Sequence, residues 1–416
     1  MSPTAKWPVA FTVTIALIGM SVRGPIVGVP PLIGQLSADL HLSGSTAGLL
    51  TSLPLLCLAL TSPLVAVIAR WLGLDLTLVA GLALLVIATA ARPWGSAGQL
   101  VFWTVVAALG IAVSNVVTPV VIRRHAGRRT GVLTAILTSS YGAGAALTTA
   151  AAVPLSHVLG WRGALAALAG PAAIALCAWV LRMRHGTDSR GVSKVGAAAS
   201  AEVLAVDDTR PAGKRSAAWL NGDAWWLAVF FGLQSALFYG VSTWLPGMLR
   251  DGAGVSDEVA GTATAVFHLV GIGGMLSVPL LMRHLGTSRH VALVSAAGWL
   301  ILFAGLDLGP VVWLPWVLIG GFAQGAGISL ALALIAVRPI DADYGRDVSA
   351  LVQSVGYGLG AVGPILLGWL HDTSDGWATV LIACLSTTAV MGMVGMRAAT
   401  NRRIGSPIAG PSGGGA

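Results

Sequence analysis

The chain has 416 residues, of which 56% are hydrophobic and only 10% are charged, whereas a soluble domain carries about 25% charged residues. This composition excludes an ordinary soluble domain and indicates a protein with several membrane spans. The formal charge of +8 does not indicate nucleic-acid binding, because the basic residues lie in short loops between apolar runs.

The apolar runs predict the secondary structure in chain order. A helix needs about 20 apolar residues to cross the hydrocarbon core of a bilayer. Twelve segments approach this length, so we expect an all-α membrane protein with 12 transmembrane helices. The expected spans are residues 8–36, 46–69, 76–91, 99–122, 130–154, 161–183, 224–249, 259–282, 290–306, 311–337, 348–370 and 377–397.

The first of these runs follows Lys6 and could resemble a secretory signal peptide. It is too long for the apolar core of such a peptide, it contains Arg23, and no small-residue cleavage site follows it. We therefore expect an uncleaved first span.

The distribution of Lys and Arg predicts the orientation of the chain. Cytoplasmic loops of membrane proteins carry an excess of these residues. Of the 24 Lys and Arg residues, all but four fall in loops and tails on the same side as the N-terminus. Arg92, Arg162 and Arg250 fall on the other side, and Arg23 lies within a span. We therefore expect both termini to be cytoplasmic in a multi-pass protein of the inner or plasma membrane.

A polar stretch at residues 186–218, rich in Ala, Gly and Ser, separates six spans from six. Such a composition is typical of a flexible linker, and a Gly/Pro/Ser tail is typical of disorder. We expect an N-terminal six-helix bundle at residues 1–183, a cytoplasmic linker at 184–222, a C-terminal six-helix bundle at 223–399 and a disordered tail at 400–416.

The two halves repeat each other. The sequence Arg70-Trp71-Leu72-Gly73 recurs 213 residues later as Arg283-His284-Leu285-Gly286. The stretch Tyr141-Gly142-Ala143-Gly144 recurs 216 residues later as Tyr357-Gly358-Leu359-Gly360. These constant offsets predict two pseudo-symmetric bundles, related by an axis along the membrane normal.

This arrangement resembles the major facilitator superfamily, in which the solute site lies between the halves near the membrane midplane. The resemblance implies that Arg70, Gly73, Arg283 and Gly286 belong to the cytoplasmic gating loops of that superfamily. The first loop departs from the usual motif, because the Asp before the basic residue is absent and Ser62-Pro63 stands where the opening Gly would be.

Within the superfamily, the chain resembles the cyanate and nitroimidazole transporter family. The resemblance rests on three stretches, although Gly24 intervenes here between the Arg and the Pro that are usually adjacent. They are residues 22–25 (Val-Arg-Gly-Pro), 232–239 (Gly-Leu-Gln-Ser-Ala-Leu-Phe-Tyr) and 353–357 (Gln-Ser-Val-Gly-Tyr) with His371-Asp372.

Arg23 is the only charged residue in the first span. Its guanidinium keeps its proton under all physiological conditions, and placing it at mid-bilayer depth costs about 2.5–3.5 kcal/mol on insertion scales. All sixteen Asp and Glu residues lie in loops or at span ends, so no carboxylate neutralises Arg23 at that depth. We therefore expect Arg23 to line a polar path for an anionic or strongly accepting solute. The alternative is a structural charge that binds carbonyls freed at Gly24-Pro25.

His268 is the titratable side chain near the centre of a span, and an unperturbed histidine titrates in the physiological range. It is a candidate for proton coupling. The alternative is a neutral histidine that forms a hydrogen bond with a neighbouring helix.

Uncharged polar side chains complete the candidate substrate site. The repeat places the position of Arg23 opposite Phe238 or Tyr239, and phenol and amide groups form hydrogen bonds without charge. For each residue the alternative is an interhelical hydrogen bond, worth about 0.6 kcal/mol in membranes. The candidates are Gln234, Tyr239, Tyr141, Tyr357 and Gln324.

The sequence lacks the patterns typical of disulfides, metal sites, nucleotide binding and catalysis. Cys57, Cys177 and Cys384 lie in apolar runs without metal-ligand spacing, so neither a disulfide framework nor a metal site is expected. The glycine clusters lie in apolar runs without the Lys-Ser/Thr of a phosphate-binding loop, and no nucleophile is paired with a base. We expect no cofactor and no enzymatic activity.

We therefore expect a secondary active transporter that moves a small anion or compact polar solute by alternating access, as a monomer in the lipid bilayer and with a possible co-transported proton. The resemblance implies cyanate-like or nitroimidazole-like solutes. One alternative is a drug or antibiotic efflux pump of the same superfamily. Another is a non-transporting membrane sensor or scaffold, although the linker is too short for a signalling domain.

Overall fold

The structure, a computed structural model, describes residues 9–126, 129–185, 219–340, 342–374, 376–400 and 402–405. In these residues the elements are helices, apart from an isolated bridge between Pro339 and Ile404. Residues 186–218 of the predicted linker and most of the predicted tail lie outside the described residues.

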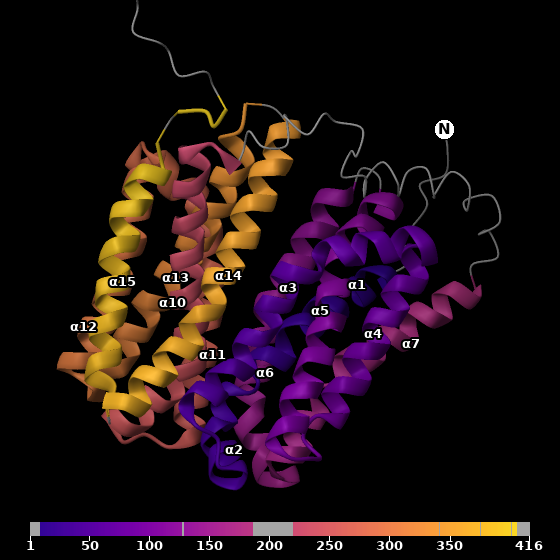
Figure 1. Cartoon of the computed structure of the whole chain (residues 1–416), viewed down its shortest axis with the longest axis horizontal. Helices are drawn as coiled ribbons and strands as arrows, with labels where there is room; N and C mark the ends of the chain where they lie inside the picture. The colour runs from indigo at the N-terminus through magenta and orange to yellow at the C-terminus, as the bar shows by residue number, and fades with distance from the viewer. Residues whose placement is uncertain are drawn as a thin grey trace, which may run out of the picture.

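The helices form two groups that follow each other in the chain (Figure 1). The N-terminal bundle contains α1 (Val9–Val27), η1 (Pro30–Leu32), α2 (Ile33–Leu40), α3 (Gly44–Leu72), α4 (Leu74–Ala91), α5 (Ala97–Ala126), α6 (Thr130–Ala167) and α7 (Gly170–His185). The C-terminal bundle contains α10 (Gly222–Ala253), α11 (Asp257–Leu285), α12 (Ser288–Leu308), η3 (Pro310–Val312), α13 (Trp313–Val337), α14 (Ala342–Ser374) and α15 (Trp377–Ala398).

Each of the twelve predicted spans falls on helix, which confirms the prediction of an all-α membrane protein. Within the described residues, ten helical stretches are long and apolar enough to cross a membrane. The apolar stretch Gly44–Leu58 of α3 marks the second span. The sixth span is shared between the end of α6 and α7, because the chain kinks at Gly160, where φ is 67°.

The first predicted span, residues 8–36, falls in the apolar helical stretch Val9–Leu40, but the chain does not cross it as one continuous helix. Helix α1 ends at Val27, and η1 and α2 continue the path separately. Proline cannot donate a backbone hydrogen bond and crowds the preceding turn, and this stretch contains Pro25, Pro30 and Pro31. The break therefore follows from the sequence of the segment itself.

The residues that repeat after 213 positions include the N-terminal and C-terminal caps of two equivalent helices. Helix α3 begins after Ser43 and α11 begins after Ser256, and each serine hydroxyl accepts a hydrogen bond from a first-turn backbone N–H. Both helices have 29 residues and end at glycines with positive φ, Gly73 and Gly286. Serine favours helix starts and glycine favours helix ends, so equivalent residues set equivalent helix lengths.

The two bundles meet along two equivalent pairs of helices, α3 with α14 and α6 with α11. In each pair, the second span of one half contacts the fifth span of the other half. A Cβ atom at Gly48 would lie only 2.3 Å from the carbonyl oxygen of Pro364, so glycine allows α3 to approach α14 closely. Small residues commonly permit such contacts between membrane helices.

Polar contacts between the bundles gather at the end that carries α2. The backbone N–H of Ser45 donates to the Asp372 carboxylate at 3.3 Å, and Nδ1 of His157 lies 3.2 Å from Oε1 of Glu258. Towards the opposite end the ribbons of the two bundles diverge, and α1 begins and α15 ends there (Figure 1).

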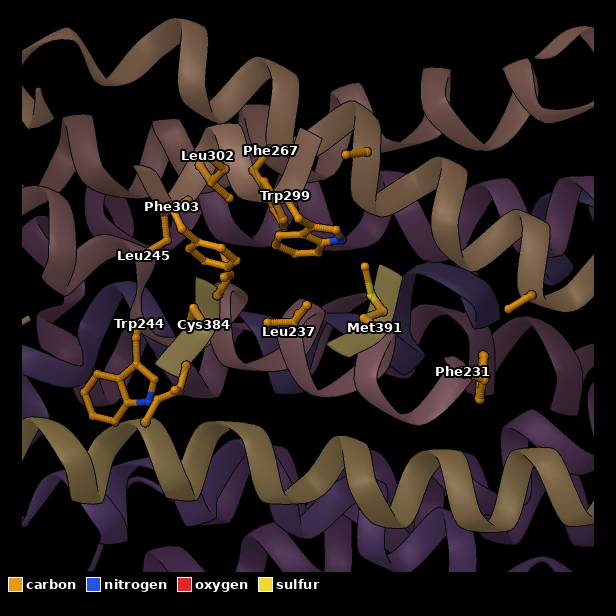
Figure 2. Close-up of a cluster of buried hydrophobic side chains, with 14 of the residues drawn as sticks. Phe231, Leu237, Trp244, Leu245, Phe267, Trp299, Leu302, Phe303, Cys384 and Met391 are labelled. Atoms are coloured by element: carbon orange, nitrogen blue, oxygen red, sulfur yellow. The ribbon is translucent and has the colours of Figure 1, made fainter. Parts of the chain in front are cut away.

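Aromatic packing organises the interior of the C-terminal bundle. The rings of Trp299 and Phe303 stack with centroids 5.5 Å apart, and Phe267 lies 5.9 Å from Trp299. Figure 2 shows these rings pointing into a space that Leu237, Cys384 and Met391 also enter. This core fixes α10, α11, α12 and α15 relative to one another, and therefore positions the residues that α10 and α11 present to the other bundle.

Candidate functional site

Arg23 of α1 reaches across to the C-terminal bundle. Its Nη1 donates a hydrogen bond to the hydroxyl of Tyr239 on α10, and the side chain is partly buried. Arg23 lies four residues before the end of α1, where the backbone carbonyls carry the negative end of the helix dipole, which favours a positive charge. The hydrogen bond to Tyr239 thus takes the place of a carboxylate partner for the guanidinium.

Two further tyrosines approach the same guanidinium. Its Cζ lies 5.9 Å from the ring centroid of Tyr141 on α6 and 5.7 Å from that of Tyr239. These distances are within the range of cation–π attraction. Tyr357 on α14 lies close enough to interact electrostatically with Arg23 and Tyr239. We name Arg23, Tyr141, Tyr239 and Tyr357 the arginine–tyrosine cluster.

The cluster consists of two pairs of repeat-equivalent residues. Arg23 and Tyr239 are 216 residues apart, and the same offset separates Tyr141 from Tyr357. All four side chains therefore gather around the pseudo-symmetry axis, where the first and fifth spans of both halves meet. The offset alone left Phe238 and Tyr239 open as counterparts of Arg23, and the structure selects Tyr239.

His268 of α11 adjoins the cluster. Its ring centroid lies 5.6 Å from those of Phe238 and Phe267, and it lies within electrostatic range of Arg23. The side chain is buried, and its Nε2 has no hydrogen-bond partner among the described residues. A buried polar nitrogen without a hydrogen-bond partner is energetically costly, which distinguishes His268 from the other buried side chains around the cluster.

Gln234 and Gln324 are directed elsewhere. Both are fully buried in the C-terminal bundle, where Nε2 of Gln234 donates to the backbone carbonyl of Gln324 at 3.0 Å and Nε1 of Trp299 donates to Oε1 of Gln234 at 3.2 Å. Gln234 and Tyr239 are five residues apart, which separates them by about 140° around an α-helix. The amide of Gln234 therefore connects α10 to α12 and α13, and the structure does not bring it to Arg23.

The Gln324 side chain lies between α13 and α11, against Gly271. Its Oε1 has no hydrogen-bond partner among the described residues. Gln324 of α13 therefore contacts α11 at Gly271, which is one helical turn from His268. It lies inside the C-terminal bundle.

The predicted gating loops lie at equivalent helix ends. Gly73 and Gly286 follow α3 and α11, and their N–H groups each donate to a carbonyl four residues earlier at 3.1 Å. Arg283 is exposed. The side chain of Arg70 lies outside the described residues.

Arg92 is a residue that sequence reasoning placed in an outer loop, yet its side chain is only 1% exposed. Its Nη1 donates to the carbonyl of Pro25 at 2.9 Å, two residues from Arg23. The hydroxyl of Thr149 on α6 lies 3.4 Å from the carbonyl of Val27, but it also donates to the carbonyl of Ala145 in its own helix at 2.8 Å. The last carbonyls of a helix lack partners within the helix, and Arg92 supplies a donor to one of them at the broken end of α1.

The described part of the chain contains no group of three or more His, Cys, Asp or Glu side chains that could hold a metal ion. Among the described Asp and Glu residues, each lies at a helix end or in a connection. The arginine–tyrosine cluster and His268 therefore offer one permanent charge, three phenols and an imidazole. These groups can bind an anion or a polar acceptor reversibly, and they provide no nucleophile activated by a base.

Comparison with known proteins identifies the family. Residues 9–364 match the family described as Major Facilitator Superfamily. The chain belongs to the Major Facilitator Superfamily. It is an integral membrane protein of a family of transporters, and it is not an enzyme.

Relatives within this superfamily are similar over nearly the whole chain. A 2-nitroimidazole transporter of Escherichia coli (strain K12) is 32% identical over 391 residues, which cover 94% of this chain and 95% of the relative. The cyanate transport protein CynX of the same organism is 26% identical over 378 residues, covering 87% and 90%. The predicted resemblance to the cyanate and nitroimidazole transporters is therefore confirmed.

A solved structure shows the same superfamily fold. The crystal structure of the nucleoside transporter NupG superposes with a TM-score of 0.72 at 12% identity, covering 94% of this chain and 98% of that chain. This confirms the fold of twelve helices in two pseudo-symmetric bundles.

The anchoring of α1 generates a prediction. Arg92→Met keeps most of the packing of the side chain but removes the donor to Pro25, so the end of α1 should exchange its amide hydrogens faster. Losing a hydrogen bond from a charged group costs about 1.5–3 kcal/mol, which is about 10- to 100-fold in local protection. Hydrogen exchange of the peptide that spans residues 20–33 measures the change.

Arg92→Lys should restore part of the protection, because an ammonium group can still donate to the Pro25 carbonyl. Arg162→Gln serves as the matched control, since Arg162 pairs with Asp39 at 2.7 Å but its side chain is 38% exposed. Unchanged exchange in Arg92→Met would show that the hydrogen bond to Pro25 does not hold α1.

Proposed function

We propose that this chain is a secondary active transporter that moves a small anion or compact polar solute across the cell membrane. The observation that carries the proposal is the position of Arg23. Its permanent charge lies between the two bundles, it is met by tyrosines and by no described carboxylate, and it remains partly exposed. An anion that enters the space between the bundles would neutralise this charge.

The tyrosines favour a solute that accepts hydrogen bonds. Each phenol can donate to an anionic oxygen or nitrogen, and each ring can pack against a flat solute. Tyr239 already accepts a hydrogen bond from Arg23, so its own proton is free to point towards a solute. Tyr141 and Tyr357 would contact the solute from the other pair of helices, whereas Gln234 and Gln324 would support the site from within the C-terminal bundle.

The names of the relatives support the same solute class. One relative is described as a 2-nitroimidazole transporter and another as a cyanate transport protein. Cyanate is a small anion, and a nitroimidazole is a flat ring whose nitro oxygens accept hydrogen bonds. Both kinds of solute match a guanidinium surrounded by phenols.

His268 is the proposed site of proton coupling. A second positive charge beside Arg23 is disfavoured unless an anion lies between them. Arrival of an anionic solute would therefore favour protonation of His268, and the solute and the proton would cross together. This order of events couples solute movement to a proton gradient without a carboxylate in the membrane.

The contacts at the α2 end support alternating access within a single chain. They join the bundles at one end of the arginine–tyrosine cluster, while the bundles diverge towards the other end (Figure 1). We propose that the diverging end faces the cytoplasm, with both termini, and that the loops of Arg70, Gly73, Arg283 and Gly286 meet when this end closes. Because one chain supplies both halves of the site, a monomer suffices.

The charge of Arg23 should decide solute affinity. Arg23→Ala should weaken binding of cyanate or 2-nitroimidazole by about 10- to 100-fold, because a hydrogen bond to a charged group contributes about 1.5–3 kcal/mol. Arg23→Lys should retain intermediate affinity, since it keeps the charge but loses the planar pair of donors. Uptake into proteoliposomes gives the concentration dependence for each variant.

Arg162→Gln also removes one arginine, but from an exposed ion pair away from the cluster, and it should transport normally. Equal transport by wild type, Arg23→Lys and Arg23→Ala would remove Arg23 from the site and would contradict the proposal.

The coupling role of His268 gives a separate prediction. Glutamine forms hydrogen bonds but does not titrate near neutral pH, so His268→Gln should abolish accumulation driven by an imposed pH gradient. Exchange of labelled for unlabelled solute without a gradient should persist, because it needs no net proton movement. Retention of gradient-driven accumulation in His268→Gln would exclude this residue as the coupling site.

A further inference from the structure

A groove with a volume of about 1220 Å³ lies on the C-terminal bundle, far from the arginine–tyrosine cluster. Its walls are the first turns of α10 and α12 and the last turns of α15. These turns all lie at the end of the molecule where α15 ends (Figure 1). The residues used below are Trp226, Arg289, Met393, Met396, Arg397 and Arg402, and we name this feature the arginine groove.

Three arginines line the groove at its polar end. Arg289, Arg397 and Arg402 are all exposed, and none of them forms an ion pair with a carboxylate within the described part of the chain. Asp223 also lines the groove, but it lies 3.8 Å from Nη2 of the buried Arg338. The groove therefore carries a net positive charge.

The backbone adds to this positive field. Helix α12 begins beside Arg289, and the Thr287 hydroxyl accepts from the N–H of His290 at 3.4 Å. Helix α10 begins at Gly222. Helix N-termini carry partial positive charge and attract anions, so the start of α12 reinforces the arginines, whereas the start of α10 is capped by Asn221 and carries Asp223 in its first turn.

Arg402 is held in place by the chain that follows α15. The N–H of Ile404 donates to the carbonyl of Arg338 at 2.8 Å, and the N–H of Ile340 donates to the carbonyl of Ile404 at 3.2 Å. In addition, Nε of Arg338 donates to the carbonyl of Arg402 at 3.0 Å. The buried Arg338 thus holds the backbone of Arg402 beside the groove, from which the exposed Arg402 side chain extends.

Apart from the arginines, Asp223, Thr287 and Thr400, the lining of the groove is apolar, and its largest side chains are exposed. The exposed fractions are 44% for Trp226, 58% for Met393 and 39% for Met396. Met393 and Met396 lie on the side of α15 that also exposes Ile382 and Val390 further from the helix end. An apolar strip thus runs along α15 from the arginines into the membrane-spanning part of the bundle.

We propose that the arginine groove binds one anionic glycerophospholipid, with its phosphate between the three arginines and an acyl chain along Trp226 and the methionines of α15. Arginine pairs well with phosphate oxygens, and basic pockets between membrane helices bind anionic headgroups. The groove combines a positive end with an apolar strip at membrane depth, which is the charge and polarity pattern of this class of lipid. The proposal does not depend on the transported solute.

Native mass spectrometry of the full chain, purified in a neutral detergent, tests the proposal with phosphatidylglycerol and phosphatidylcholine as probes. Phosphatidylglycerol should be retained at one molecule per chain in preference to phosphatidylcholine. Each arginine near an anionic headgroup contributes about a fivefold factor to affinity. The triple variant Arg289→Gln, Arg397→Gln and Arg402→Gln should therefore bind phosphatidylglycerol about 100-fold more weakly.

A matched triple variant, Arg123→Gln, Arg129→Gln and Arg184→Gln, removes the same charge from exposed positions of the N-terminal bundle and should bind like wild type. Met393→Gln with Met396→Gln should weaken phosphatidylglycerol binding while leaving the arginines intact. Should the groove triple variant fail to fold, as judged by its thermal unfolding, Arg397→Gln alone should still weaken binding about fivefold.

Three outcomes would overturn the proposal. The first is equal retention of phosphatidylcholine and phosphatidylglycerol. The second is equal loss of binding in the two triple variants, which would indicate attraction to overall charge. The third is displacement of phosphatidylglycerol by inorganic phosphate at equal concentration, which would indicate a site for a free anion.

Discussion

The structure depends on how one permanent positive charge is accommodated between two apolar bundles. Arg23 cannot lose its proton, and no described carboxylate reaches it. It is stabilised instead by the hydroxyl of Tyr239 and by the rings of Tyr141 and Tyr239. These contacts hold the charge without neutralising it. The charge is therefore not compensated by a carboxylate, and it is this uncompensated charge on which the proposed attraction for an anionic solute rests.

The pseudo-symmetry of the two halves brings the four residues of the arginine–tyrosine cluster together, but the helix that carries Arg23 ends earlier than its counterpart in the other half. The 216-residue offset brings Arg23 to Tyr239 and Tyr141 to Tyr357. The same offset aligns Pro25 with Val241, and α10 continues past Val241 whereas α1 ends at Val27. Arg92 binds the Pro25 carbonyl in the half where the helix breaks. At either repeat offset its counterpart is uncharged, Gly305 or Leu308. The early end of the first helix, and the buried arginine that binds one of its last carbonyls, therefore occur together in the N-terminal half and not in the C-terminal half.

The sequence predicts features that local composition determines, and it misses those that depend on packing. Span positions follow from apolar length, and the ends of α3 and α11 follow from Ser43, Ser256, Gly73 and Gly286, whose propensities act locally. The direction of Gln234 was not predictable, because it depends on Trp299 and Gln324 in other helices. Arg92 was assigned to an outer loop for the same reason. The arginine groove combines residues of α10, α12 and α15, which are distant in the sequence.

Access to position 23 from water tests the central claim most directly. In a variant that lacks Cys57, Cys177 and Cys384, Arg23→Cys should react with a membrane-impermeant, negatively charged thiol reagent added from one side of the membrane. A solute added at about 100 times the concentration that saturates the wild type, to offset the weaker binding expected without Arg23, should slow this reaction, because it would occupy the space beside Tyr239. If the introduced thiol reacts only with lipid-soluble reagents, position 23 faces lipid or closed protein, and Arg23 does not line a path between the bundles.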